Sequence, residues 1–216
     1  MHSQLGEAGT DTDAVIRDET TRADAHGYAL EWKLYGHDEP ADLADRLLAA
    51  GFRPDAAETV LALPLTDASA SAFTAPAYDI RRVHDADGLD AVVEISREIG
   101  RTGAEEEKHR LAAVLRETPR EMSVHVAYVD GEPVACGRTH FAPGSGLSEL
   151  AGGRTKTTHR RRGLFTALVA ARLHEALARG RTHLVVDALP TSEPILRKRG
   201  FHALTRTRPY LYEPAR

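Results

Sequence analysis

The alternation of apolar and polar residues predicts a short first region and a longer second one. Near the N-terminus, Leu30, Trp32 and Leu34 alternate with charged residues, which is the two-residue period of a half-buried strand. A helix with leucine spacing follows and stops at Gly51, and a second strand is predicted over residues 59–63. Residues 27–65 are therefore predicted to form a small β-α-β unit.

A longer series of elements begins at Tyr78. The apolar periods predict the order strand, two helices, three strands, helix, strand, helix and strand. Asp130 and Gly131, between two apolar runs, are a strong hairpin signal. A hairpin among strand–helix units predicts an α/β fold with a mixed sheet and helices on both faces. We assign residues 78–216 to this domain and the β-α-β unit to an N-terminal extension of it.

Two segments lack a clear period. Residues 1–26 are acidic and hold few large apolar side chains, so we expect a disordered or loosely held arm. Residues 66–77 are rich in Ala, Ser and Thr, which is typical of a linker.

Composition excludes several classes of protein. The chain has 216 residues, of which 42% are hydrophobic, enough for a core. Its single cysteine, Cys136, excludes an internal disulfide framework, and the histidines show no metal-binding spacing, so we expect no metal. No apolar run reaches the ~18–20 residues that cross a membrane, and the first ten residues are unlike a secretory signal. We therefore expect a cytoplasmic protein with no membrane partner.

The net charge of −4 conceals an uneven distribution along the chain. Residues 151–216 carry 14 Lys and Arg against 4 Asp and Glu, whereas residues 1–150 carry 14 against 28. A basic C-terminal third favours an anionic ligand, either a phosphate-containing cofactor or a nucleic acid. The nucleic acid is less favoured, because the sequence shows no helix-turn-helix or RNP pattern.

The most informative segment is GGRTKTTHRRRGLFT at residues 152–166, between a predicted strand and a predicted helix. It holds five Lys and Arg and no acid. A helix start leaves backbone N–H groups without partners and adds a partial positive charge, so the segment predicts an anion site. It matches neither a Walker loop nor a dinucleotide-binding fingerprint.

The run from Arg160 to Gly163 before an apolar helix resembles motif A of the GNAT N-acetyltransferase superfamily. The order of elements over residues 78–213 and the Gly-Phe that closes residues 192–201 strengthen the resemblance. It implies acetyl-CoA as co-substrate, with the pyrophosphate on the amides of residues 161–166 and the pantetheine arm on the backbone of Gly153 and Thr155. The implied cofactor-binding residues are Gly153, Arg154, Thr155, Arg160, Arg161, Arg162, Gly163, Phe165 and Thr166.

Two positions depart from the family pattern. Phe165 stands where the signature usually has Gly or Ala, and Leu196 stands where a general-acid tyrosine is often found. A primary amine, with a pKa near ~10.4, must lose a proton before it attacks a thioester. The resemblance places Glu149 and Asp187 near the reacting carbonyl as candidate bases, with water as the alternative. Candidate acids are Ser192, Tyr210 and Tyr212, and a purely structural role stays open for every one of these carboxylates and hydroxyls.

The sequence is therefore interpreted as an N-acetyltransferase that transfers an acetyl group to a primary amine of a small molecule or protein, by direct attack in a ternary complex. A catalytically silent acyl-CoA-binding or regulatory module is the alternative, and a nucleic-acid-binding protein is less favoured. The acceptor and a homodimeric state are left open. Residues 46–52 (RLLAAGF) echo residues 195–201 (ILRKRGF), which suggests that residues 27–65 are a remnant of a second acetyltransferase-like half.

Overall fold

The computed structural model describes residues 11–73 and 77–214, and it divides them into two units. The first unit holds the chain up to Leu61, Asp187–Ile195 and the segment that begins at Ala203. The second unit holds Ala62–Val186 and Leu196–His202. The first unit is thus completed by C-terminal residues, which the division predicted from the sequence did not include.

The second unit is built on a mixed sheet, as predicted. Its strands are hydrogen-bonded in the order β4-β5-β6-β7-β8. The pairs from β4 to β7 are antiparallel, and β7 and β8 are parallel. The bounds are β4 (Asp79–Val83), β5 (Met122–Val129), β6 (Glu132–His140), β7 (Leu147–Thr155) and β8 (His183–Ala188). β3 (Glu58–Pro64) and β8 pass from one unit into the other.

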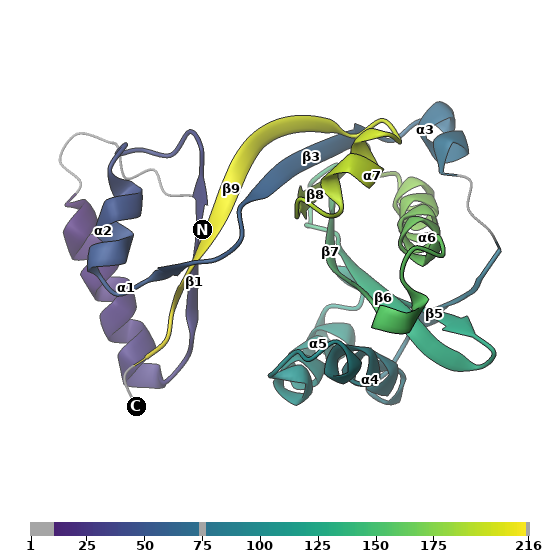
Figure 1. Ribbon diagram of the computed structural model, residues 1–216, viewed down its shortest axis with the longest axis horizontal. Coiled ribbons are helices and arrows are strands. Elements are labelled where there is room, and N and C mark those ends of the chain that lie inside the picture. The colour runs from purple at the N-terminus through teal and green to yellow at the C-terminus, as the bar shows by residue number, and fades with distance from the viewer. Residues whose placement is uncertain (1–10, 74–76, 215–216) are drawn as a thin grey trace. The chain divides into compact units, whose positions relative to one another are not determined.

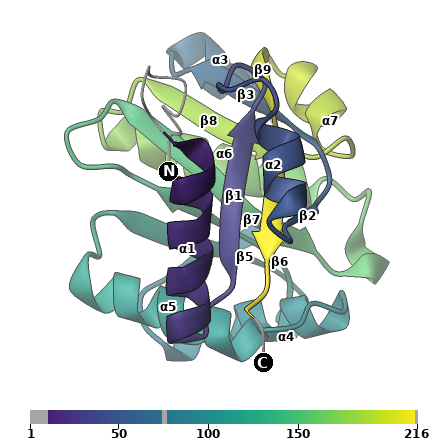
Figure 2. The ribbon, with the colours of Figure 1, turned by 90° about the vertical axis from the view of Figure 1, so that its left-hand side faces the viewer.

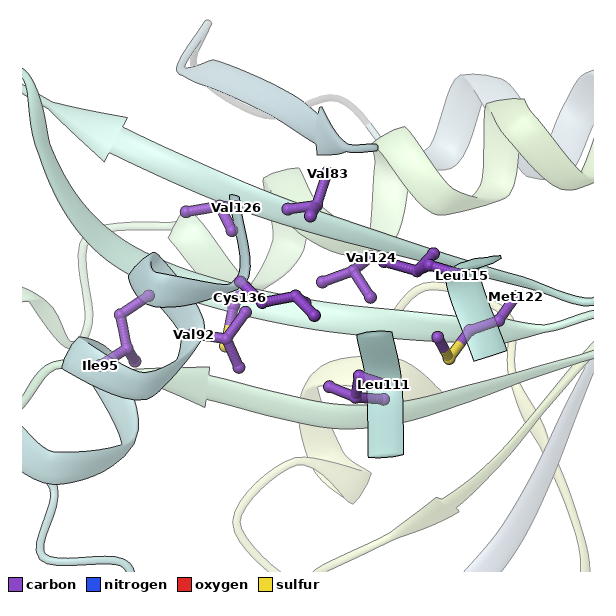
Figure 3. Close-up of a cluster of buried hydrophobic side chains, with 10 residues drawn as sticks. Val83, Val92, Ile95, Leu111, Leu115, Met122, Val124, Val126 and Cys136 are labelled. Carbon is purple, nitrogen blue, oxygen red and sulfur yellow. The ribbon is translucent and has the colours of Figure 1, made fainter. Parts of the chain in front are cut away.

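Helices cover both faces of this sheet (Figure 1). One face carries η1 (Asp87–Leu89), α4 (Asp90–Glu98) and α5 (Ala104–Glu117), and the other carries α6 (Leu164–Ala178). Side chains from η1, α4, α5, β4, β5 and β6 fill the core on the first face: Val83, Leu89, Val92, Ile95, Leu111, Leu115, Met122, Val124, Val126 and Cys136 (Figure 3). The remaining short helices are α3 (Asp67–Ala72), η2 (Thr157–His159) and α7 (Glu193–Arg197).

The first unit packs two helices on a small antiparallel sheet, and Figure 2 shows these elements with their labels. The elements are α1 (Thr12–His26), β1 (Leu30–Tyr35), α2 (Leu43–Ala49), β2 (Arg53–Pro54) and β9 (His202–Tyr212). β1 and β2 both pair with β9, with Leu30 opposite Tyr212. The core consists of Ile16, Trp32, Leu43, Leu47, Phe52 and Tyr210. The predicted strand and helix are present, but their partner strand comes from the far end of the chain.

Residues 12–26 differ from the expected disordered arm, because they form helix α1. The Asp11 side chain accepts a hydrogen bond from the Ala14 amide at 3.0 Å, and Gly27 ends the helix in the left-handed conformation. Ile16 and Ala23, seven positions apart, are the buried apolar residues on this helix. So narrow a stripe gives too weak a pattern to predict a helix. Residues 1–10 lie outside the described residues.

The predicted linker also contains a helix. Thr66 and Ser69 form a reciprocal capping box at the start of α3. The composition of the segment hid this helix, because Ser and Thr are equally common in linkers and at helix starts. Residues 74–76 of the segment lie outside the described residues.

The echo between the two Gly-Phe segments is a shared helix stop. Gly51 and Gly200 are both left-handed, with φ of 91° and 93°. The Phe52 amide bonds the Leu47 carbonyl at 3.1 Å, and the Phe201 amide bonds the Leu196 carbonyl at 3.3 Å. Left-handed glycines end many helices in this way, and the suggestion of a second acetyltransferase-like half stays a prediction.

Candidate functional site

The C-terminal half of β7 presents an open backbone edge. Its parallel ladder with β8 joins only residues 147–150. The ladder with β6 is irregular between Cys136 and Arg138, opposite Gly152 and Gly153, and Gly152 is left-handed with φ of 59°. Main-chain groups of β7 beyond Leu150 therefore lack ladder partners on the β8 side in the described part of the chain. Such groups are free to bond an extended ligand.

The start of α6 exposes backbone N–H groups at a tight turn. Arg161 and Gly163 are left-handed, with φ of 61° and 89°, and such residues turn successive N–H groups toward a common point. The first hydrogen bond of the helix joins the Ala167 amide to the Gly163 carbonyl at 3.0 Å. The amides of residues 164–166 therefore have no acceptor within the helix. The Tyr78 hydroxyl donates to the Arg162 carbonyl and ties this loop to the residue before β4.

Two of the five Lys and Arg side chains in residues 152–166 already form ion pairs with carboxylates. Lys156 is buried, and its ammonium contacts Glu94 at 2.5 Å and Glu132 at 2.7 Å. The Arg154 guanidinium is 7% exposed and contacts Glu107 at 2.6 Å. The Arg154 guanidinium is thus engaged by Glu107, and the assignment of Arg154 to the cofactor site stays a prediction. Arg160, Arg161 and Arg162 are the exposed cations of the segment.

Phe165 lies against β7. Its ring is 3.7 Å from the point where a Cβ on Gly153 would stand, so it fills space that this glycine leaves open. The ring is half-buried, and the backbone amide of Phe165 is one of the three at the helix start that have no acceptor within the helix. The Thr166 side chain is buried, so its amide is the group that it offers at this point.

Glu149 is exposed on β7, next to the open edge. It pairs across the sheet with His140 of β6. Burial lowers the pKa of His140 below its ordinary value, and the charge of Arg138 lowers it further, while Glu149 acts in the opposite direction. His140 was not predicted as a site residue, and the sequence carries no local signal that would pair it with Glu149.

Asp187 belongs to the first unit, where it forms an ion pair that the sequence did not predict. Lys33 of β1 contacts Asp187 at 2.5 Å and Glu58 of β3 at 3.2 Å. Burial lowers the pKa of Lys33, but the hydrogen bond and charge of Asp187, with those of Glu58, outweigh it and raise the pKa above its ordinary value. Asp187 is therefore held by a permanent cation, which makes it a poorer candidate for a base than Glu149.

The predicted acids have structural roles in the same unit. The Ser192 hydroxyl donates to the Leu189 carbonyl at 3.1 Å, in the turn before α7. Tyr210 is 5% exposed and packs in the core of the first unit, and the Tyr212 hydroxyl bonds the Asp24 carboxylate at 3.0 Å. Leu196, at the family's tyrosine position, is buried in the second unit. Ser192 and Tyr210 therefore have structural contacts of their own, and their role as proton donors stays a prediction.

Other chemistries find little support in the structure. In residues 11–73 and 77–214, no group of three His, Cys, Asp or Glu could hold a metal ion. Over the same residues, no helix is both long enough and apolar enough to span a bilayer. Burial raises the pKa of the Cys136 thiol to about 11, so this side chain is not a nucleophile at neutral pH.

Comparison with solved structures places the fold. A GCN5-related N-acetyltransferase from Kribbella flavida superposes with a TM-score of 0.64 at 20% identity, over 96% of this chain and 78% of that chain. A tandem GNAT protein from the clavulanic acid biosynthesis pathway gives 0.66 at 17% identity, over 94% and 70%. PaiA N-acetyltransferase from Thermoplasma acidophilum, in complex with coenzyme A, gives 0.50 at 12% identity, over 62% and 99%. Identities this low show a shared fold alone.

A comparison with curated proteins gives no match. The model of the acetyltransferase (GNAT) family matches residues 89–201, which is more than half of the chain. This range contains α4, α5, the strands from β5 to β8 and all of residues 152–166. The chain therefore belongs to the GNAT acetyltransferase family.

Proposed function

We propose that the protein is an acetyl-CoA-dependent N-acetyltransferase that acts on a primary amine. The observation that carries this proposal is the start of α6, where three free amides follow a left-handed glycine and three exposed arginines. The family match supports the same reading, and so does the coenzyme A complex of PaiA.

The residues present fit the proposed co-substrate. A pyrophosphate would accept hydrogen bonds from the amides of residues 164–166, and the helix dipole adds about 0.3–1 kcal/mol for such an anion. Arg160, Arg161 and Arg162 supply positive charge beside it. The free edge of β7 at Gly153 and Thr155 would hold the two amides of the pantetheine arm. Acetyl-CoA supplies the acyl thioester for the reaction.

Glu149 is the proposed base. Its exposed carboxylate stands immediately before the open edge of β7 and takes a proton from the acceptor ammonium, directly or through one water. The amine nitrogen then forms a bond to the carbonyl carbon and releases its second proton to water, and the carbon–sulfur bond breaks. The coenzyme A thiolate takes its proton from water, because Ser192 and Tyr210 are engaged and residue 196 is leucine.

Calorimetric titration with acetyl-CoA tests the proposal, with desulfo-CoA and ATP as comparison ligands. Gly163→Glu places a carboxylate at the helix start and should abolish binding. Gly180→Glu is the matched control, because Gly180 lies just after the other end of α6 and is also left-handed, with φ of 69°. Binding by the control and not by Gly163→Glu, with equal melting temperatures, supports the site. Absence of binding by the folded wild type would overturn it.

A panel of amines then separates catalysis from binding. Release of free coenzyme A thiol in the presence of one amine, and its loss in Glu149→Gln, is the expected result. Saturable acetyl-CoA binding without turnover would instead favour a silent acyl-CoA-binding or regulatory module. The hydroxyl of Ser192 on a backbone carbonyl and the buried Leu196 are the observations that favour this second candidate.

A further inference from the structure

A charged hydrogen-bond chain on the α4/α5 face of the sheet leads toward Glu149. Arg154 of β7 and Arg138 of β6 both donate to the Glu107 carboxylate of α5. Arg138 also donates through Nε to Nε2 of His140, at 3.2 Å. These hydrogen bonds therefore connect the largely buried Glu107 carboxylate to the half-buried imidazole of His140 at the end of β6.

The sheet register brings His140 and Glu149 together. The two residues are direct partners in the antiparallel ladder of β6 and β7. Their neighbours Thr139 and Leu150, also direct partners, are almost fully buried on the opposite face. Side chains of direct partners share one face, with Cβ atoms about 4.5–5.5 Å apart. The Glu149 carboxylate is thus within reach of the His140 ring.

The contact with Arg138 determines which nitrogen of His140 carries the proton. A guanidinium has only donors, so Nε2 must accept and is unprotonated. The neutral ring then carries its hydrogen on Nδ1. Arg138 and Glu149 are the charged groups that act on this ring, and its partner on β5 is the apolar Met122. Burial and Arg138 lower the pKa of His140, so the ring is neutral at pH 7.

We infer that His140 is a positioning residue for Glu149, whose carboxylate accepts a hydrogen bond from the His140 Nδ1–H. This inference rests on the proposed function, in which Glu149 is the base. An exposed glutamate side chain otherwise samples many rotamers. A hydrogen bond from His140 to one carboxylate oxygen restricts these rotamers, while the second oxygen faces the amine. Arg138 holds the imidazole in the required tautomer and so acts on Glu149 through His140.

Nitrogen NMR of the histidine rings tests the contact without any acceptor or acetyl-CoA. The His140 signal is assigned by its loss in His140→Asn. We expect the Nδ1–H tautomer, and a titration midpoint that falls in Glu149→Gln and rises in Arg138→Met. Glu117→Gln, which removes an exposed carboxylate of α5, is the control and should leave the midpoint unchanged. An Nε2–H tautomer, or a midpoint insensitive to Glu149→Gln, overturns the inference.

Kinetics with an amine found in the panel test the positioning role. His140→Phe should lower kcat about tenfold or more with the KM for acetyl-CoA unchanged, and His140→Asn, whose amide still donates, should recover much of the loss. In a Glu149→Gln background, His140→Phe should have no further effect, because the two residues act as one unit. Additive losses would refute the role. If the wild type acetylates no amine, the proposed function fails, while the NMR result still decides whether His140 binds Glu149.

Discussion

Loss of Glu107 should strongly destabilise the second unit, because its one carboxylate accepts hydrogen bonds from two guanidinium groups. Arg154 donates to both of its oxygens, at 2.6 and 2.8 Å, and Arg138 adds a third bond at 2.9 Å. The Nε of Arg154 is buried and has no hydrogen-bond partner in the described part of the chain. Replacing Glu107 by Gln would remove the charge and turn an amide donor toward a buried cation.

The expected cost follows from this burial. Removing one partner of a buried ion pair typically costs about 3–5 kcal/mol, because the other charge stays buried without compensation. For a chain of this size, each kcal/mol lowers the melting temperature by about 2–4 °C, so the fall should be about 6–20 °C. The neighbouring Glu106 is exposed, and Glu106→Gln should change the free energy of unfolding by less than about 0.5 kcal/mol.

The effect should also depend on pH. Burial raises the pKa of Glu107, but the hydrogen bond and charge of Arg154, with the charges of Arg138 and Arg101, outweigh it and hold the pKa below its ordinary value of 4.5. The stability that this carboxylate contributes is therefore present above pH 4.5 and is lost as the pH falls through the folded-state value. The difference between wild type and Glu107→Gln should shrink below that pH.

Urea unfolding followed by far-UV circular dichroism measures these differences, with fluorescence of the single tryptophan, Trp32, reporting the first unit in parallel. The double variant Glu107→Leu, Arg154→Met should be more stable than Glu107→Gln, because it removes both buried charges. Equal stability of Glu107→Gln and Glu106→Gln would refute the reasoning. A difference that persists unchanged at acidic pH would do the same.

Three further outcomes are expected. Gly152→Ala should destabilise the fold by about 1–3 kcal/mol in thermal unfolding, because φ is 59° and the added Cβ would stand 2.5 Å from Arg138 Nη1. Lys33→Met should lower the free energy of unfolding at pH 7 and by less at acidic pH, where Glu58, whose pKa burial raises, is protonated and no longer needs a cation beside it. Cys136 is 1% exposed, so its reaction with Ellman's reagent should follow unfolding, and fast labelling of the native protein would contradict the burial.

The second unit was predictable because its periods are strong and local. The strand and the helix predicted at the two ends of residues 152–166 are present as β7 and α6. Asp130 and Gly131 make the expected hairpin turn, with φ of 51° and 82°. The first unit was less predictable, since β1 pairs with β9 at the other end of the chain. No local pattern reports a partner so distant in sequence.

The candidate site divides in the same way. The helix start at Gly163 is a local property of about ten residues, and its geometry is as predicted. The ionised side chains are not local, because Asp187 is paired with Lys33, 154 positions away, and Arg154 with Glu107, 47 positions away. Sequence alone could therefore name candidate carboxylates but could not tell an unpaired one from half of an ion pair.

The same pairings change the meaning of the uneven charge. The basic excess of residues 151–216 suggested an anionic ligand, yet Arg154 and Lys156 meet carboxylates of Glu94, Glu107 and Glu132 in the acidic part of the chain. These two cations of the basic excess thus form ion pairs with α4, α5 and the first residue of β6, and they hold the end of β7 against those elements. The arginines of residues 160–162 are exposed instead, and they flank free amides. We therefore expect the cations that form no ion pair within the described residues, rather than the total charge, to mark where an anion binds at the start of α6.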